Sequence, residues 1–179
     1  MRLTPPDVER YFVIRKALLR YNGRQLRKRG IEVPSDDWAH SGLRDETPWP
    51  DAKTIGSFVA KNPARLKKQD LAIAESWKRA VAGYFYAVRH LKNHSIFVSE
   101  REPYRVYAAI GHQAELSVLL ALTPDLYELR LLPFESRIVC SVIAFTDEYP
   151  ATWPAAVKNK LLRAYRKARL RREIITAID

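Results

Sequence analysis

Apolar side chains recur at helical spacing over the first thirty residues of the chain. At 100° per residue, one side of such a helix collects Val8, Tyr11, Phe12, Ile14, Leu18, Leu19 and Leu26. Thr4 is a suitable N-cap, Pro5 suits the first turn, and Gly30 is a natural stop. The pattern therefore predicts an amphipathic helix from about Thr4 to Gly30, with basic residues on its other side.

A long polar segment separates this helix from two shorter ones. Residues 35–50 are rich in turn formers and acidic side chains, which favours an acidic loop. A helix is expected over 51–61 and should break at Asn62-Pro63. A further helix is expected around 70–81, with an apolar face made by Leu71, Ile73, Ala74, Trp77 and Val81.

The pattern changes at Gly83 to short runs of aromatic and β-branched residues, which are typical of strands. The five predicted strands cover residues 83–91, 95–100, 104–111, 126–134 and 137–145. Residues 112–122 favour a short helix between the third and fourth strands. A last helix is predicted over 154–172, with an apolar stripe made by Val157, Leu161, Ala164, Tyr165 and Ala168.

The order of these elements predicts a single α+β domain over residues 1–179. A helical segment over 1–82 precedes the sheet over 83–146, and a basic helix over 154–176 follows it. Strands joined by short turns cannot run parallel, so we expect a mainly antiparallel sheet of about five strands. Basic amphipathic N- and C-terminal helices should flank this sheet, and the helices should cover one of its faces.

Positive charge is concentrated at the two ends of the chain. Residues 1–34 contain nine Lys and Arg against three acidic residues, and residues 154–179 contain eight against two. Each end is therefore +6 and the middle is −1, which gives the total of +11. This distribution is typical of a surface that binds a polyanion.

Several motifs between residues 71 and 176 resemble an uncharacterised bacterial protein family. The shared features are a helix containing Trp77, a strand with Gly83 and Phe85, an "RHLK…IF" hairpin over 89–97, and an "LPF…RIV" strand over 132–139. The sequence departs from the family after Val139, where Cys140-Ser141-Val142 replaces an expected Tyr-Asp-Gly step. The resemblance supports the sheet and implies no activity.

Catalytic and metal-binding signatures are weak in this sequence. The single cysteine, Cys140, lies in an apolar run and cannot form an intramolecular disulfide or a cysteine zinc site. His90 and His94 flank a turn without a further ligand motif. No P-loop, Gly-rich dinucleotide motif or nucleophile elbow occurs. We therefore expect no cofactor, no metal and, on balance, no enzymatic activity.

The leading hypothesis is a nucleic-acid-binding accessory protein that contacts DNA or RNA phosphates with weak sequence specificity. Arginine predominates in both basic helices, and its planar guanidinium is suited to phosphate. The candidate phosphate-neutralising residues are Arg20, Arg24, Arg27 and Lys28 in the first helix, and Arg163, Arg166, Lys167 and Arg171 in the last.

Three alternatives remain open at this point. The basic faces could dock an acidic protein partner, as an interaction module or inhibitor. Asp125 and Glu128 superficially resemble the carboxylates of a metal-dependent nuclease, which is a remote alternative. Tyr84 and its alternate neighbours Tyr86, Val88 and His90 could form a strand face that stacks unpaired bases.

The sequence contains no apolar run near 18 residues and no secretory signal pattern at its start. No membrane partner is therefore expected, and a cytoplasmic location is the expectation that follows.

Overall fold

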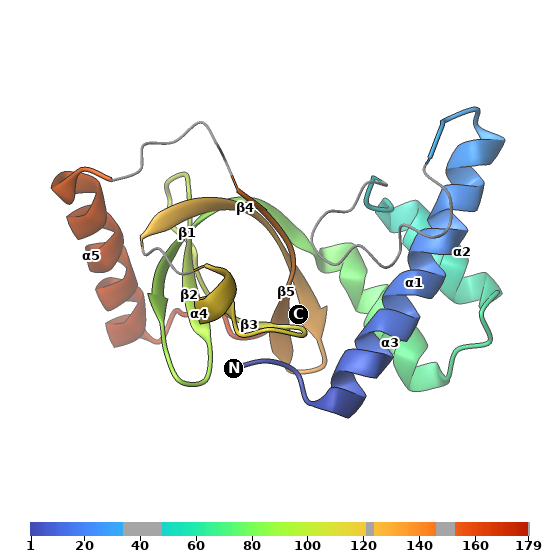
Figure 1. Ribbon diagram of the computed structural model, residues 1–179, viewed down its shortest axis with the longest axis horizontal. Coiled ribbons are helices and arrows are strands. Elements are labelled where there is room, and N and C mark those ends of the chain that lie inside the picture. Colours follow the sequence, from blue (N-terminus) through green and yellow to red (C-terminus); the bar gives the residue numbers. More distant parts are fainter. Residues whose placement is uncertain (34–47, 121–123, 146–152, 179) are drawn as a thin grey trace.

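A small β-barrel lies in the middle of the molecule, with three helices at one end and a single helix at the other (Figure 1). The computed structural model describes residues 1–33, 48–120, 124–145 and 153–178. The helices are α1 (Pro5–Lys28), α2 (Ala52–Lys61), α3 (Lys68–Ser76), the 3-10 turn η2 (Trp77–Arg79), α4 (Leu116–Leu119) and α5 (Ala155–Arg171). The strands are β1 (Val81–His90), β2 (Ser95–Ser99), β3 (Val106–Gly111), β4 (Asp125–Phe134) and β5 (Arg137–Phe145).

The helix ends agree with the capping residues in the sequence. The Thr4 side chain accepts a hydrogen bond from the Asp7 backbone N–H at 3.4 Å, and the Asp51 side chain accepts one from that of Thr54 at 2.7 Å. Asn62 ends α2 in the left-handed conformation, next to the predicted break. Most of the loop predicted over 35–50 lies outside the described residues.

The five strands pair in a mainly antiparallel way, as the sequence predicts, but they close into a barrel in the order β1-β2-β3-β5-β4. β3 and β5 run parallel and pair at Ile110–Val139 and Gly111–Cys140, while the other pairs are antiparallel. The barrel closure and the parallel pair were not predicted, because the sequence argument considered only consecutive strands. β3 and β5 are separated in sequence by α4 and β4, so the short-turn argument does not apply to them.

The chain after α5 completes the edge of β3. Ile175 donates its backbone N–H to the Val106 carbonyl at 2.9 Å and accepts one from Ala108 at 2.9 Å. A five-stranded barrel is also the architecture of the OB fold. The hydrogen bonds of Ile175 to β3 fix the C-terminal end of α5 to the barrel.

Three apolar cores hold these layers together. Alternate strand residues such as Phe85, Phe97 and Leu129 fill the barrel interior. A second core joins α1, α2 and α3 to the outer side of the barrel, and Leu132 and Phe134 from β4 lie in it. The third core lies between α5 and the outer faces of β1, β2 and β3.

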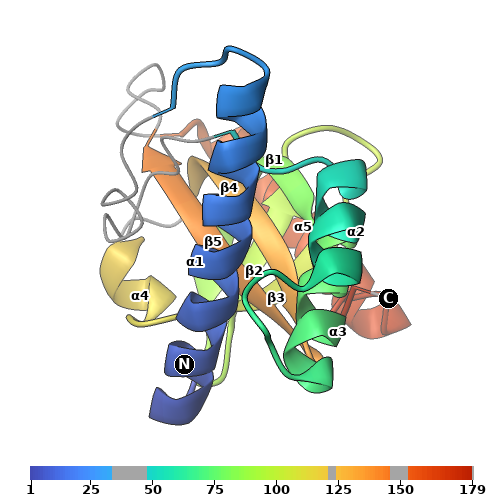
Figure 2. The same cartoon turned by 90° about the vertical axis from the view of Figure 1, so that its right-hand side faces the viewer.

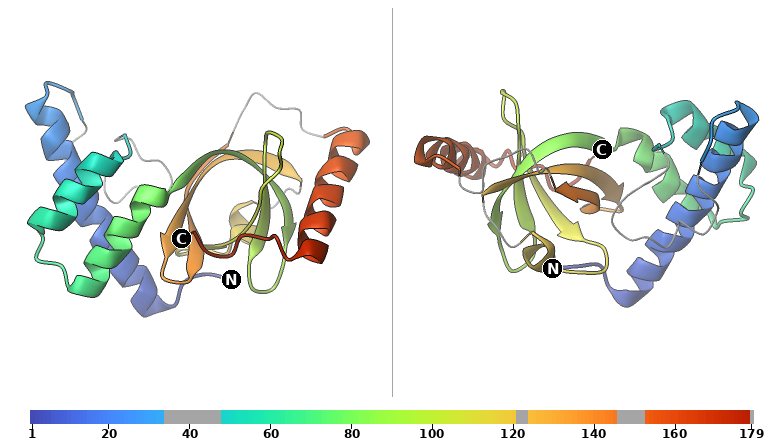
Figure 3. Two further views of the ribbon diagram at one scale, coloured as in Figure 1. Left: turned by 180° about the vertical axis from the view of Figure 1, so that it is seen from behind. Right: turned by 45° about the horizontal axis from the view of Figure 1, so that its top comes forward.

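The helices therefore lie on two sides of the barrel, and the expectation that they cover one face was wrong. Figure 2 shows α1, α2 and α3 in front of the barrel and α5 behind it, and Figure 3 shows the same separation from two other directions. Trp77 is fully buried between the helical layer and the barrel, where its Nε1–H donates to the Pro133 carbonyl at 2.9 Å. The outside of this barrel is apolar on two sides, in the second and third cores, so each of these sides is covered by its own helices.

Within the described part of the chain, no helix is long and apolar enough to cross a membrane.

Candidate functional site

The exposed side of α5 presents a continuous row of cations. We call Lys160, Arg163, Arg166, Lys167 and Arg171 the α5 basic face, and all five are exposed. At 100° per residue they fall within an arc of about 140° on the helix. Leu170, 82% exposed, lies inside the same arc. These residues include all four that the sequence analysis selected in the last helix.

The opposite side of α5 holds the helix in place. Leu161, Tyr165 and Ala168 are buried against outward-facing side chains of the barrel, among them Tyr86 and Val98. This is the stripe that the sequence predicts for the last helix. Because α5 is anchored by this core and by the Ile175 pairing, its basic side has a fixed orientation toward solvent.

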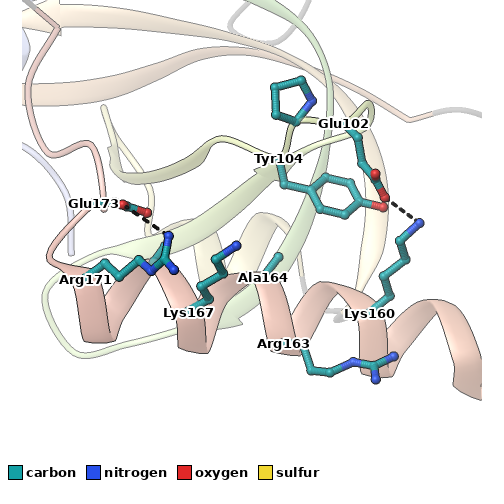
Figure 4. Close-up of a pocket in the computed structure, with 10 residues that line it drawn as sticks. Glu102, Tyr104, Lys160, Arg163, Ala164, Lys167, Arg171 and Glu173 are labelled. Carbon is teal, nitrogen blue, oxygen red and sulfur yellow. Dashed lines mark ion pairs between the residues drawn. The ribbon is translucent and has the colours of Figure 1, made fainter.

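A groove of about 600 Å³ runs between α5 and the connection from β2 to β3. Glu102, Pro103 and Tyr104 form one wall, and the other wall is made by α5 through Lys160, Arg163, Ala164, Lys167, Ala168 and Arg171 (Figure 4). The small side chains of Ala164 and Ala168 leave room beside the helix. We call this hollow the α5 groove.

Ion pairs occupy the two ends of the α5 groove and leave its centre positive. Lys160 pairs with Glu102 at 2.6 Å, and Arg171 lies 4.0 Å from Glu173 (Figure 4). Hydrogen bonds to Glu102 and Tyr104 raise the pKa of Lys160 above its ordinary value. Among the residues described, Lys167 and Arg163 make no ion pair, so the positive charge between the two ends is uncompensated.

The α1 helix presents a less uniform basic surface. Arg24, Arg27 and Lys28 are exposed near its C-terminal end, whereas Arg20 is half-buried and its Nε atom is enclosed by protein. Arg10, at the other end of the helix, pairs with Asp70 and Glu135. Tertiary contacts that the sequence does not reveal thus neutralise part of the positive charge on α1.

The two basic helices lie at opposite ends of the long axis of the molecule (Figure 1). The sequence left open whether they share one surface, and the structure separates them by the whole width of the barrel. The candidates Arg20, Arg24, Arg27 and Lys28 therefore do not extend the surface formed by the α5 basic face.

The carboxylates Asp125 and Glu128 do not converge as a nuclease site requires. Residues of β4 alternate between the barrel interior and its outside, so positions three apart face opposite sides. Asp125 accepts hydrogen bonds from Trp153 Nε1–H at 3.2 Å and from the Leu126 N–H at 2.9 Å. Over the described ranges, no cluster of three His, Cys, Asp or Glu side chains is placed to hold a metal ion.

The histidine and cysteine side chains have structural surroundings. His90 hydrogen-bonds Ser95 Oγ and the Leu120 carbonyl, each at 2.7 Å. Burial, and then the charge of Arg15, lower the pKa of His112 from 6.5 to about 4. Burial raises the pKa of the Cys140 thiol to about 12, so the reactive thiolate is disfavoured.

Sequence reasoning did not select the residues of the β2–β3 connection. Arg101, Glu102, Tyr104 and Arg105 lie in a short turn segment that carries no motif. Their place beside α5, about 60 residues further along the chain, depends on how the last helix packs on the barrel. In the sequence, this segment is marked only by its mixture of charged and aromatic residues between two predicted strands.

No family model, curated protein or solved structure that was compared matches this chain. The resemblance to an uncharacterised bacterial family therefore stays a prediction.

Proposed function

We propose that the protein binds nucleic acid through the α5 basic face, mainly by contacts with phosphate groups. The observation that supports this is the fixed row of exposed cations on α5, of which Arg163, Arg166 and Lys167 make no ion pair with any described residue. Lys and Arg contacts to phosphate carry little sequence information, so the specificity should be weak.

The surroundings of α5 favour nucleic acid over an anionic membrane. An interfacial helix inserts an apolar face into lipid, and the apolar face of α5 is already buried against the barrel. Leu170 is the one large apolar side chain exposed on the described helix. A single exposed leucine contributes far less apolar area than a membrane-binding helix needs.

The barrel topology is compatible with this proposal but does not carry it. OB-type barrels bind oligonucleotides and oligosaccharides on the face around strands 2 and 3. In this protein α5 covers much of that face. On this side of the barrel, the basic side of α5 is therefore exposed to solvent instead of the strands. Function belongs to the site rather than to the fold, so the charges of α5 carry the proposal.

The experiment is a fluorescence anisotropy titration of labelled duplex DNA, single-stranded DNA and RNA at several salt concentrations. Contacts with about four phosphates predict a log–log salt slope between about −3 and −4 on duplex DNA. Vesicles with anionic lipid and a heparin competitor serve as polyanion controls. Absent binding, or a slope near zero, would overturn the proposal.

The same preparation tests the acidic-protein alternative. Bound nucleic acid should raise the 260/280 absorbance ratio of the purified protein. The alternative predicts a preparation that is free of nucleic acid, binds none, and retains one discrete acidic protein in a pull-down. That result would show that the α5 basic face is a protein interface.

A further inference from the structure

Among the side chains whose burial the structure describes, Tyr84 is the one exposed aromatic residue. It is 42% exposed and lies on β1, on the same outward face as Tyr86 and Val88. Those two residues are buried beneath α5, whereas Tyr84 belongs to none of the three apolar cores. The helix thus covers part of the strand face and leaves one aromatic ring in solvent.

The neighbours of Tyr84 do not provide a structural reason for an aromatic residue. Its cross-strand partner on β4 is Glu128, which is exposed. A tyrosine that stabilised the sheet would pack on an apolar or aromatic neighbour across the strands. Glu100, which donates its backbone N–H to the Tyr84 carbonyl at 3.0 Å on the other side of the strand, is also acidic. The exposed part of the ring is therefore accessible to a ligand.

A hollow of about 340 Å³ is lined by Tyr84 together with Phe85 and Tyr107 from the barrel and with Ser99, Glu100, Arg101 and Arg105. Gly83 has a φ of +149°, a conformation that favours glycine, and no atom lies within 4 Å of the place where its Cβ would stand. Gly83 precedes Tyr84 in β1, so the missing side chain leaves space open at this end of the strand.

Two arginines and one carboxylate, that of Glu100, line the hollow, so the arginines are in excess. The Arg101 side chain is 92% exposed, and its Nε lies 3.7 Å from the carboxylate of the half-buried Glu100. An ion pair with so exposed a partner is weak, so Arg101 can exchange it for a phosphate. Arg105 is also exposed and makes no ion pair among the described residues. An aromatic ring beside exposed arginines is the arrangement that binds unpaired bases and their phosphates.

We propose that Tyr84 is a base-stacking platform and that the ligand of this surface is single-stranded nucleic acid. This inference rests on the proposed function and adds the substrate class. One base stacks on the Tyr84 ring, while Arg101 and Arg105 contact the adjacent phosphates. A duplex cannot use this platform, because its bases are already stacked and paired.

The β2–β3 connection links this platform to the α5 groove. Glu102, Pro103 and Tyr104 line the α5 groove, and Arg101 and Arg105 on either side of them line the Tyr84 hollow. A single strand that crosses this connection contacts both hollows. The phosphates at its other end then meet Lys167 on the α5 basic face.

The test compares Tyr84→Leu and Tyr84→Trp with the wild-type protein. The probes are a labelled 12-nucleotide single strand and a labelled duplex, each titrated at fixed low salt. Tyr84→Leu should weaken single-strand binding by roughly 5- to 100-fold and change duplex binding less than twofold. Tyr84→Trp should retain single-strand binding, and its additional tryptophan fluorescence should be quenched by the single strand.

The possible failures are distinguishable. If the wild-type protein binds the single strand and Tyr84→Leu binds it equally well, the stacking inference is wrong and the proposed function stands. Equal losses on single strand and duplex, or tighter wild-type binding to duplex, also overturn the inference. If the wild-type protein binds neither probe, the proposed function fails and the inference fails with it. Far-UV circular dichroism and Tm should be unchanged, because Tyr84 lies outside the three cores.

Discussion

At the scale of single residues, His112 shows how the helical layer controls an ionisable group. Its imidazole stacks on Tyr11 with ring centroids 5.6 Å apart and meets Phe12 edge-on at 5.3 Å. These surroundings lower its pKa to about 4, chiefly through burial. The folded protein therefore holds this ring neutral, while the unfolded chain binds a proton near the ordinary pKa of 6.5.

The first prediction concerns stability against pH. Between pH 6.5 and pH 4 the unfolded state binds more protons at His112 than the folded state does, so stability falls as the pH falls. The contribution of His112 to this loss is about 2 kcal/mol between pH 7 and pH 5. Urea unfolding of wild type and His112→Phe at both pH values measures it, and the variant should lose less stability.

If wild type and His112→Phe lose the same stability between pH 7 and pH 5, this account is wrong. Should His112→Phe fail to fold, NMR titration of the wild type gives the same information, since the His112 ring should not titrate above pH 5.

At the scale of elements, α5 packs on the barrel with one side, and its other side is the proposed binding surface. The second prediction compares two leucines of this helix, because Leu161 is 1% exposed and Leu170 is 82% exposed. Leu161→Ala should lower the free energy of unfolding by about 2–4 kcal/mol, since it opens space in the core beneath α5. Leu170→Ala should change it by less than about 0.5 kcal/mol. Urea unfolding monitored by circular dichroism measures both, and similar effects would show that α5 is not held by its apolar side.

Most elements could be predicted from the sequence because their signals are local. The helix near Thr4 has its own cap, and the strand containing Phe97 is a short β-branched run between turns. The parallel β3–β5 pair could not be predicted in this way, because it joins strands separated by a helix and another strand. The barrel closure is a property of the packed chain and leaves no local pattern.

At the scale of the whole molecule, sequence charge alone did not place the candidate site. The sequence shows two ends of +6, but not that α1 and α5 lie on opposite sides of the barrel. It also does not show that Arg10 is paired with Asp70. The basic residues of α5 could be selected because their helical spacing is regular. Tyr84 was noted only as one of several strand aromatics, because its exposure depends on where α5 ends on the sheet.

The central claim is that the exposed cations of α5, and not the net charge of the protein, bind nucleic acid. Two triple variants separate these explanations, since each lowers the net charge by the same three units. One replaces Arg163, Arg166 and Lys167 by Gln on α5, and the other replaces Arg24, Arg27 and Lys28 by Gln at the far end of α1.

The measurement is the salt dependence of binding to a labelled single strand for these two variants and the wild type. The α5 variant should weaken binding by at least about tenfold at low salt and bring the log–log slope about two units closer to zero. The α1 variant should retain most of the wild-type affinity and slope. Equal losses in both variants, or a larger loss in the α1 variant, would contradict the account.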